Sequence, residues 1–323
     1  AHRYLSELGP LDAHGIELGV RASKRLASAG RRAHARGDMP ATASLLRRAA
    51  ACRPEGDRLR PPLWIEAGEA LTQSGELDAA DEVLRKGRDE AEELFDEVMA
   101  ATATLGLIYL HHLTGSETSG DKVIAQVRDA MRVLERAGNE RGLSRAWRII
   151  TNVHFTGCRY LDATNAAEKM IEHARQAGDQ ALIQRALPAL AVCAQLGPTP
   201  VPQAIRIVLD VLVELGEDQK AEASALRALA NLEAMRGEIA EARSLYQRSR
   251  ATLDRLGWHY DAALTSAMTS GAVELIAGDA ETAEAELRRD HEALAAMGER
   301  NYISTTAAFL AEALYRQGRD EEA

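Results

Sequence analysis

Apolar residues recur at helical spacing along most of the chain, in stretches of about 15 to 17 residues that each end near a glycine. Eight of these glycines stand in the segments ARGD, QSGE, LTGS, FTGC, QLGP, MRGE, IAGD and RQGR, at Gly37, Gly75, Gly115, Gly157, Gly197, Gly237, Gly278 and Gly318. Their successive spacings are 38, 40, 42, 40, 40, 41 and 40 residues. A period near 40 over eight units indicates an internal repeat.

A second set of glycines falls about halfway between the first, at Gly138, Gly178, Gly216, Gly257 and Gly298. A helix end favours a residue that tolerates the left-handed backbone conformation, and glycine does so without strain. The pattern therefore predicts that each repeat unit consists of a helix, a turn, a second helix and a second turn. Two such helices and two short loops fill 40 positions and leave no room for a strand. We predict an all-α chain.

Small residues recur at two fixed distances from the turn glycine. Five residues after it stand Ala80, Ala242, Ala283 and Ala323, and seven residues before it stand Gly30, Gly68, Ala230, Gly271 and Ala311. Side chains of this size let the two helices of a unit approach closely. In the third, fourth and fifth units the small residue before the glycine is replaced by Ile108, Ile150 and Leu190, so the middle of the array is irregular.

This pattern resembles the tetratricopeptide repeat, and the segment WIEAGEALTQSGELDAADEVL at Trp64–Leu84 matches it best. The period exceeds the usual 34 residues or so. The resemblance implies a tetratricopeptide-type α-solenoid of about seven and a half helix-turn-helix units. We expect residues 1–323 to form a single continuous superhelix, with a leader segment at 1–15 and repeats over 16–323, the last unit being truncated. GPTPVP at Gly197–Pro202 should end one helix and start the next.

Charge is spread unevenly over the chain, whose net charge is −10. Residues 1–60 hold 12 Lys and Arg against 6 Asp and Glu, which leaves −16 for the remainder. We do not expect an acidic protein to bind nucleic acid directly, because phosphate binding needs a basic surface. The basic N-terminal end either faces an acidic partner or consists of arginines on solvated helix faces.

The cysteines Cys52, Cys158 and Cys193 lie far apart, with no C-x-x-C pair and no histidine at metal-ligand spacing. We therefore expect a reducing, cytoplasmic setting and no bound metal. No apolar run approaches the roughly 18 residues of a membrane span. The chain starts at Ala1 and stops within a repeat, so we expect a fragment of a longer protein.

Several segments are similar to the repeat region of bacterial adenylate/guanylate-cyclase-type multidomain ATPases: ERGLSRAWRII, GPTPVPQAI, LEAMRGEIAEAR, SGAVELIAGDAETAEAELR and ALAAMGERNYISTTAAFLAEALYRQGR. In that family a cyclase domain and a P-loop ATPase precede the repeats. Here no G-x-x-x-x-G-K-[ST] motif is present. The resemblance implies a non-catalytic interaction and sensor arm without cofactors, which reports to an upstream ATPase or cyclase module. The alternatives are the repeat arm of a LuxR-type ATP-dependent transcription activator and a stand-alone scaffold.

In the resembled repeat, the first helix of each unit lines a concave groove at positions ten, six and three before the turn glycine. The groove residues implied here are Tyr109 and His112 in the third unit, Trp147, Thr151 and His154 in the fourth, and Arg227 and Asn231 in the sixth. The groove would bind a protein, a peptide or a small effector.

Two of these side chains form a candidate clamp. Arg227 and Asn231 could hold a carboxylate through charge-assisted hydrogen bonds, unless Arg227 pairs with a nearby glutamate. Trp147 could stack on a ligand or anchor one unit on the next. The histidines line the groove or pack, and tandem His111 and His112 point about 100° apart, which disfavours a shared metal ion.

Overall fold

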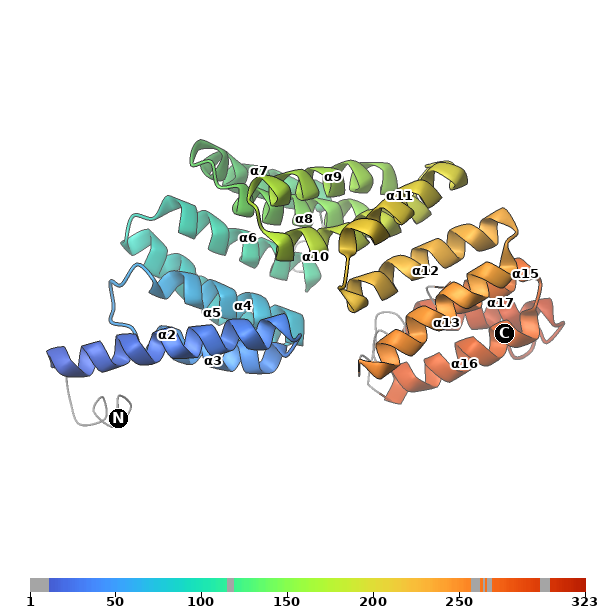
Figure 1. Cartoon of the computed structure of the whole chain (residues 1–323), viewed down its shortest axis with the longest axis horizontal. Helices are drawn as coiled ribbons and strands as arrows, with labels where there is room; N and C mark the ends of the chain where they lie inside the picture. The colour runs from blue at the N-terminus through green and yellow to red at the C-terminus, as the bar shows by residue number, and fades with distance from the viewer. Residues whose placement is uncertain (1–11, 115–118, 257–261, 264, 266–268, 297–302) are drawn as a thin grey trace. The chain divides into compact units, whose positions relative to one another are not determined.

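The computed structural model describes residues 12–114, 119–256, 262, 263, 265, 269–296 and 303–323. Over these residues the regular structure consists of helices, fifteen in all, and contains no strand (Figure 1). The all-α prediction is therefore confirmed. The chain divides into two compact units, Ala1–Gly157 (unit 1) and Cys158–Ala323 (unit 2), and each is described by itself.

Unit 1 contains α2 (Ala13–Ala35), α3 (Met39–Ala51), α4 (Arg60–Ser74), α5 (Leu77–Glu93), α6 (Glu97–Leu113), α7 (Gly120–Arg136) and α8 (Glu140–Thr156). Unit 2 contains α9 (Tyr160–Gln176), α10 (Gln180–Leu196), α11 (Val201–Leu215), α12 (Gln219–Arg236), α13 (Ile239–Arg255), α15 (Gly271–Ala277), α16 (Ala280–Ala296) and α17 (Ile303–Arg316). We call the helix that precedes each turn glycine an A helix, and the following helix a B helix. The predicted continuous superhelix concerns how the two units join, and it stays a prediction.

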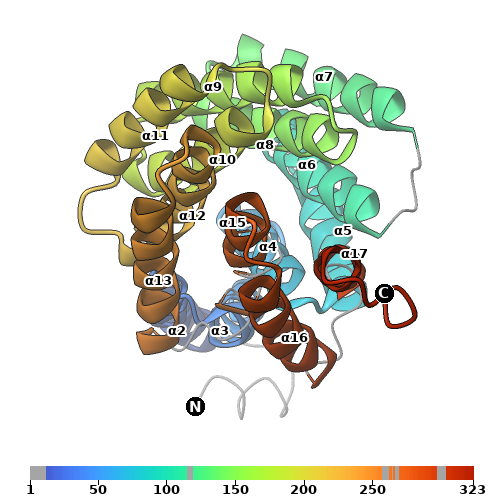
Figure 2. The same cartoon turned by 90° about the vertical axis from the view of Figure 1, so that its right-hand side faces the viewer.

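The A and B helices of successive repeats form two layers. In unit 1, α6 and α8 lie in one layer and α7 in the other, and in unit 2 α9 and α11 face α10 and α12 in the same way (Figure 2). The small residues explain the close approach. A Cβ placed on Gly68 of α4 would lie 2.5 Å from Leu84 Cγ, and one on Gly106 of α6 would lie 2.9 Å from Leu84 Cδ2. Leu84 of the B helix α5 thus fits between two A helices.

The turn glycines adopt the expected left-handed conformation at most described positions. The A helices α4, α12 and α15 end at Gly75, Gly237 and Gly278, with φ values of 82°, 93° and 80°. Gly37, Gly138, Gly178, Gly216 and Gly318 also have positive φ. Gly115, Gly257 and Gly298, and most of the expected leader segment, lie outside the described residues.

Two turns differ from this expectation. After α8, Gly157 has φ −83°, and Cys158 takes the left-handed position with φ 55°. After α10, Gly197 is extended, because Pro198 follows it and a residue before proline is held out of the helical region. The prediction that GPTPVP separates two helices is confirmed: α10 ends at Leu196 and α11 begins at Val201.

Acidic and amide side chains cap many of the helices, a regularity that the glycine period does not show. Asp96 accepts a hydrogen bond from Met99 N at 3.0 Å, and Asn139 accepts one from Gly142 N at 2.8 Å. Asp38, Asp179, Asp218 and Asp279 do the same for their helices. Each cap satisfies a backbone N–H that the first turn leaves without an intrahelical partner. A glycine followed by Asp or Asn therefore ends one helix and starts the next.

Candidate partner-binding surface

The A helices α6 and α8 of unit 1 carry the five site residues that the sequence predicts for this unit. Tyr109 and His112 lie on α6, and Trp147, Thr151 and His154 lie on α8. Four of them are half-buried, whereas Thr151 is buried and its hydroxyl donates to the carbonyl of Trp147 at 2.9 Å. We call the exposed part of these two helices the α6–α8 surface.

A cation–π contact across this surface joins Arg148 of α8 and Tyr109 of α6. The guanidinium carbon of Arg148 lies 4.7 Å from the centroid of the Tyr109 ring. Arg148 makes no ion pair within the described part of the chain, and its Nε is buried without a hydrogen-bond partner. A stacked guanidinium is held flat by the ring and retains its remaining donors. Arg148 is therefore an oriented cation without a carboxylate partner among the described residues.

Two neighbouring polar atoms on α8 are also unsatisfied. Trp147 Nε1 and Asn152 Oδ1 are buried without a hydrogen-bond partner. Leaving such a group unpaired costs about 1–3 kcal/mol. Both atoms are covered by the protein itself, so the stacked Arg148 guanidinium is the feature of this surface that a ligand carboxylate would meet.

The two predicted site histidines, His112 and His154, lie on the same two helices. His112 Nε2 lies 3.4 Å from Thr156 Oγ1, a contact that links α6 to the end of α8. His154 is half-buried on α8. Among the residues that the structure describes, no three His, Cys, Asp or Glu side chains gather in a group that could hold a metal ion.

An ion pair holds α8 against α4 on this side of unit 1. Arg145 Nη2 lies 3.3 Å from Glu69 Oε2, although 76 residues separate them along the chain. The contact spans α6, which lies between these two helices in the repeat order. It helps fix the spacing of three successive A helices, and sequence spacing alone does not reveal it.

Arg227 and Asn231 belong to unit 2 and are described apart from the other five. Asn231 is only 3% exposed, and its Nδ2 donates to the Arg227 carbonyl at 3.2 Å. The Arg227 guanidinium donates to Ser224 Oγ at 3.4 Å. Both side chains therefore bond within α12, a helix that is buried along most of its length. The clamp stays a prediction.

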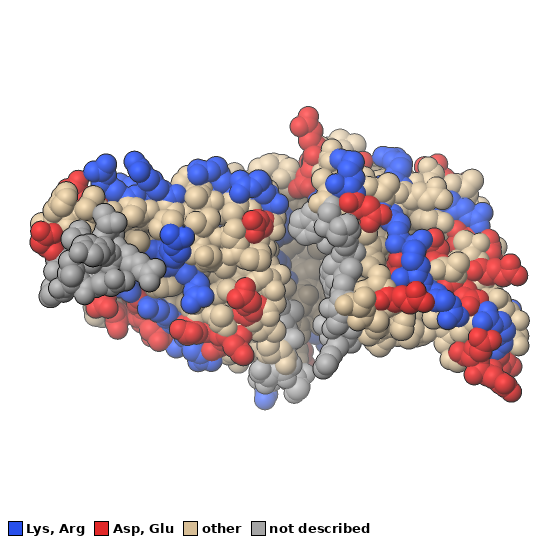
Figure 3. Space-filling model, turned by 90° about the horizontal axis from the view of Figure 1, so that it is seen from below, with Lys and Arg blue, Asp and Glu red and all other residues tan. Residues whose placement is uncertain are grey.

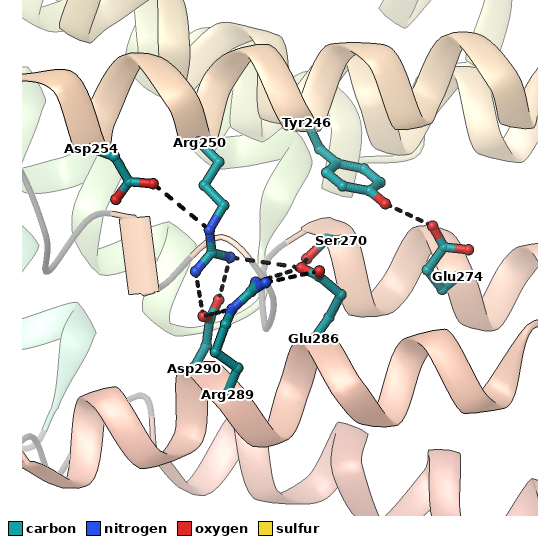
Figure 4. A network of polar contacts seen from close by, with 8 residues as sticks. All are labelled: Tyr246, Arg250, Asp254, Ser270, Glu274, Glu286, Arg289 and Asp290. Atoms are coloured by element: carbon teal, nitrogen blue, oxygen red, sulfur yellow. Dashed lines mark hydrogen bonds and ion pairs between the residues drawn. The ribbon is translucent and has the colours of Figure 1, made fainter.

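Unit 2 contains a buried network of ion pairs instead (Figure 4). Asp290 of α16 is fully buried and receives both terminal nitrogens of Arg250 from α13, at 2.6 and 2.9 Å. Arg289 bonds Asp290 and Glu286, and Ser270 donates to Glu286. These contacts tie α13 to α16, and no acid or base in them lacks a partner.

A second buried carboxylate lies next to this network. Glu274 of α15 is fully buried, accepts the Tyr246 hydroxyl at 2.8 Å and pairs with Arg243. Burial, followed by the Glu274 carboxylate, raises the pKa of Tyr246 well above its usual range. Both contacts join α13 to α15, so the network is a structural element of unit 2.

Burial disfavours nucleophilic chemistry at two of the three cysteines. Cys193 is buried, and desolvation raises the pKa of its thiol to about 11. Desolvation also raises the pKa of Cys52, which is half-buried. Cys158 is exposed at the left-handed turn. A thiol with a raised pKa is protonated near neutral pH and reacts slowly.

No protein-family model and no curated protein matches the sequence. Among solved structures, a Rap protein complexed with competence and sporulation factor aligns with 99% of this chain and 91% of its own, at 13% identity and a TM-score of 0.62. The apo form of RapI aligns with 81% of this chain and 99% of its own, at 12% identity and a TM-score of 0.53. These identities establish similarity of fold.

A third similar structure is a signal transduction ATPase with numerous domains, described as carrying a tetratricopeptide repeat sensor, from Pyrococcus horikoshii. It aligns with 99% of this chain at 13% identity and a TM-score of 0.64, and the chain spans 49% of its length. The repeat geometry and these similarities define the fold class. The chain is a tetratricopeptide-type α-solenoid, as the glycine period predicts.

Proposed function

We propose that this chain is a non-catalytic interaction and sensor arm that binds a peptide or protein segment on the α6–α8 surface. Arg148 carries the proposal, because it is stacked on Tyr109 and has no carboxylate within the described residues. A carboxylate of the ligand would complete the site through charge-assisted hydrogen bonds.

The similar structures support this function as analogues. One is a Rap protein complexed with a factor, and another is an ATPase with a tetratricopeptide repeat sensor. The proposal extends these descriptions to this chain: the arm belongs to a bacterial cytoplasmic signalling ATPase or cyclase-type regulator and relays occupancy to an upstream module. Arg227 and Asn231 remain a second proposed contact, in unit 2. No helix within the described stretches is long and apolar enough to span a membrane.

Selection from a displayed peptide library tests the binding site with ligands that the chain itself selects. Peptides selected on the chain should lose about tenfold or more in affinity for Arg148→Ala, the loss expected for one hydrogen bond to a charged group. The matched control is Arg132→Ala, since Arg132 is an exposed arginine on α7 whose ion pair is with Asp129 of the same helix. Selected peptides that bind Arg148→Ala as tightly as the control would place the ligand elsewhere.

A further inference from the structure

Phe95 combines two unfavourable features in the turn between α5 and α6. Its side chain is 93% exposed, and its backbone is left-handed with φ 54°. A left-handed conformation costs a residue with a Cβ roughly 1–2 kcal/mol. Asp96 N bonds the Ala91 carbonyl, and the same closing bond occurs from Asn139 and Asp179, where the preceding residue is Gly138 or Gly178. Phe95 thus stands at a position that takes glycine in equivalent turns.

The surroundings of Phe95 are acidic. Glu92, Glu93 and Glu97 are exposed, and Asp96 is half-exposed. Only three phenylalanines occur in the chain, so an exposed one inside the sequence EELFDE is unusual in composition as well as in conformation. A strained, exposed aromatic residue with acidic neighbours has the properties of an interface anchor.

A pocket of about 500 Å³ lies in the same unit, between the B helices α3 and α5 and above α4. Its apolar lining includes Trp64, Leu71 and Val83. The pocket is open to solvent rather than enclosed, so a phenyl ring would rest against its floor and be covered only in part.

The rim of this pocket is mainly basic. Arg47, Arg48 and Lys86 line it, and none of them forms an ion pair with a described residue. Lys86 Nζ lies 4.6 Å from the centroid of the Trp64 ring. Two carboxylates, Glu76 and Glu82, also border the pocket from the first half of α5. The α3 side therefore presents unpaired positive charge beside an apolar floor.

The basic rim continues a larger basic surface. Lys and Arg side chains gather over the N-terminal helices of unit 1 on the face shown in Figure 3. On α2, its C-cap and α3 the exposed basic residues include Arg21, Lys24, Arg25, Arg31, Arg32, Arg36, Arg47 and Arg48. An acidic segment approaching this side would therefore be attracted over a distance of about one Debye length, 8–10 Å.

We propose that Phe95 of one copy inserts into the α3–α5 pocket of a second copy. The phenyl ring would contact the apolar floor, while Glu92, Glu93 and Asp96 face Arg47, Arg48 and Lys86. We call exposed Phe95 the knob. The knob and the pocket are different surfaces of one chain, so the contact is heterologous. A dimer therefore keeps one free knob and one free pocket. The proposal is independent of the α6–α8 surface.

Sedimentation velocity over a range of concentrations tests this contact. The unaltered chain should self-associate, and Phe95→Gly should weaken association about 30-fold or more, as for an interface hot spot. Phe95→Gly should also raise the melting temperature, because glycine relieves the left-handed backbone. The matched control is Val213→Ser, which removes an 84% exposed apolar side chain from α11 and should leave association unchanged.

Mixing two defective variants tests the knob and the pocket together. At a concentration at which the unaltered chain associates, Arg47→Glu/Arg48→Glu should be mainly monomeric alone, and so should Phe95→Gly. An equimolar mixture should form a 1:1 dimer that does not grow, because only one intact knob and one intact pocket remain. A chain that stays monomeric at all concentrations, or a mixture that forms no dimer, would overturn the proposal. Peptide affinity at the α6–α8 surface should be the same in Phe95→Gly, which separates this test from that of the proposed function.

Discussion

At the scale of single residues, a turn requires glycine only at the position where its backbone is left-handed. Gly75 has φ 82°, whereas Gly157 has φ −83° and passes the left-handed role to Cys158. Both glycines look alike in the sequence, because each follows an A helix at the same period. Only the structure separates a glycine that the backbone requires from one that an alanine could replace.

Alanine substitutions should reveal this difference in the free energy of unfolding. Gly75→Ala should lower it by about 1–2 kcal/mol, since a Cβ is strained in the left-handed region. Gly157→Ala should change it by a few tenths of a kcal/mol or raise it slightly, and Cys158→Gly should raise it by about 1 kcal/mol. Urea unfolding followed by circular dichroism measures all three. Equal losses for Gly75→Ala and Gly157→Ala would contradict the turn assignment.

At the scale of helices, the buried contacts of unit 2 should make stability depend on pH. The pKa of Tyr246 is raised in the folded state, first by burial and then by Glu274. In the unfolded chain tyrosine titrates near its ordinary pKa of about 10. The folded state therefore holds its proton where the unfolded state has lost it, and stability is retained below pH 10 and falls as the pH rises above it.

Tyr246→Phe should remove this dependence, because phenylalanine does not titrate. Urea unfolding at pH 8 and at pH 10.5 should show a larger loss for the unaltered chain than for Tyr246→Phe. Tyr315→Phe is the control, since Tyr315 is 65% exposed on α17. It should lose as much stability between these two pH values as the unaltered chain does. The same loss in Tyr246→Phe would mean that another group titrates.

Helix order follows from the sequence because the turn chemistry is local: a glycine that ends a helix acts through its own φ and the bonds beside it. Side-chain contacts between helices cannot be predicted from the sequence in the same way. Counting back from the turn glycine places Tyr109 and Trp147 on A helices, yet it also selects Thr151 and Asn231, which the structure buries. The ion pairs Arg145–Glu69 and Arg250–Asp290 depend on how helices cross, and no spacing in the sequence encodes them.

At the scale of the whole molecule, unit 1 holds two proposed interaction surfaces of similar chemistry. The α6–α8 surface has an unpaired arginine stacked on tyrosine, and the α3–α5 pocket has a basic rim above apolar side chains. Both would receive negatively charged ligands, although the chain as a whole carries −10. Local charge, rather than net charge, is therefore the basis of both proposed sites.

The most direct test of the central claim is a double-mutant cycle between Arg148 and the carboxylate of a selected peptide. Each peptide is titrated calorimetrically with its carboxylate intact and as the amide, against the unaltered chain and Arg148→Ala. We predict a coupling free energy of about 1.5–3 kcal/mol, as for hydrogen bonds to charged groups, and none in the parallel cycle with Arg132→Ala. A coupling near zero at Arg148 would contradict the claim that this arginine receives the carboxylate of the ligand.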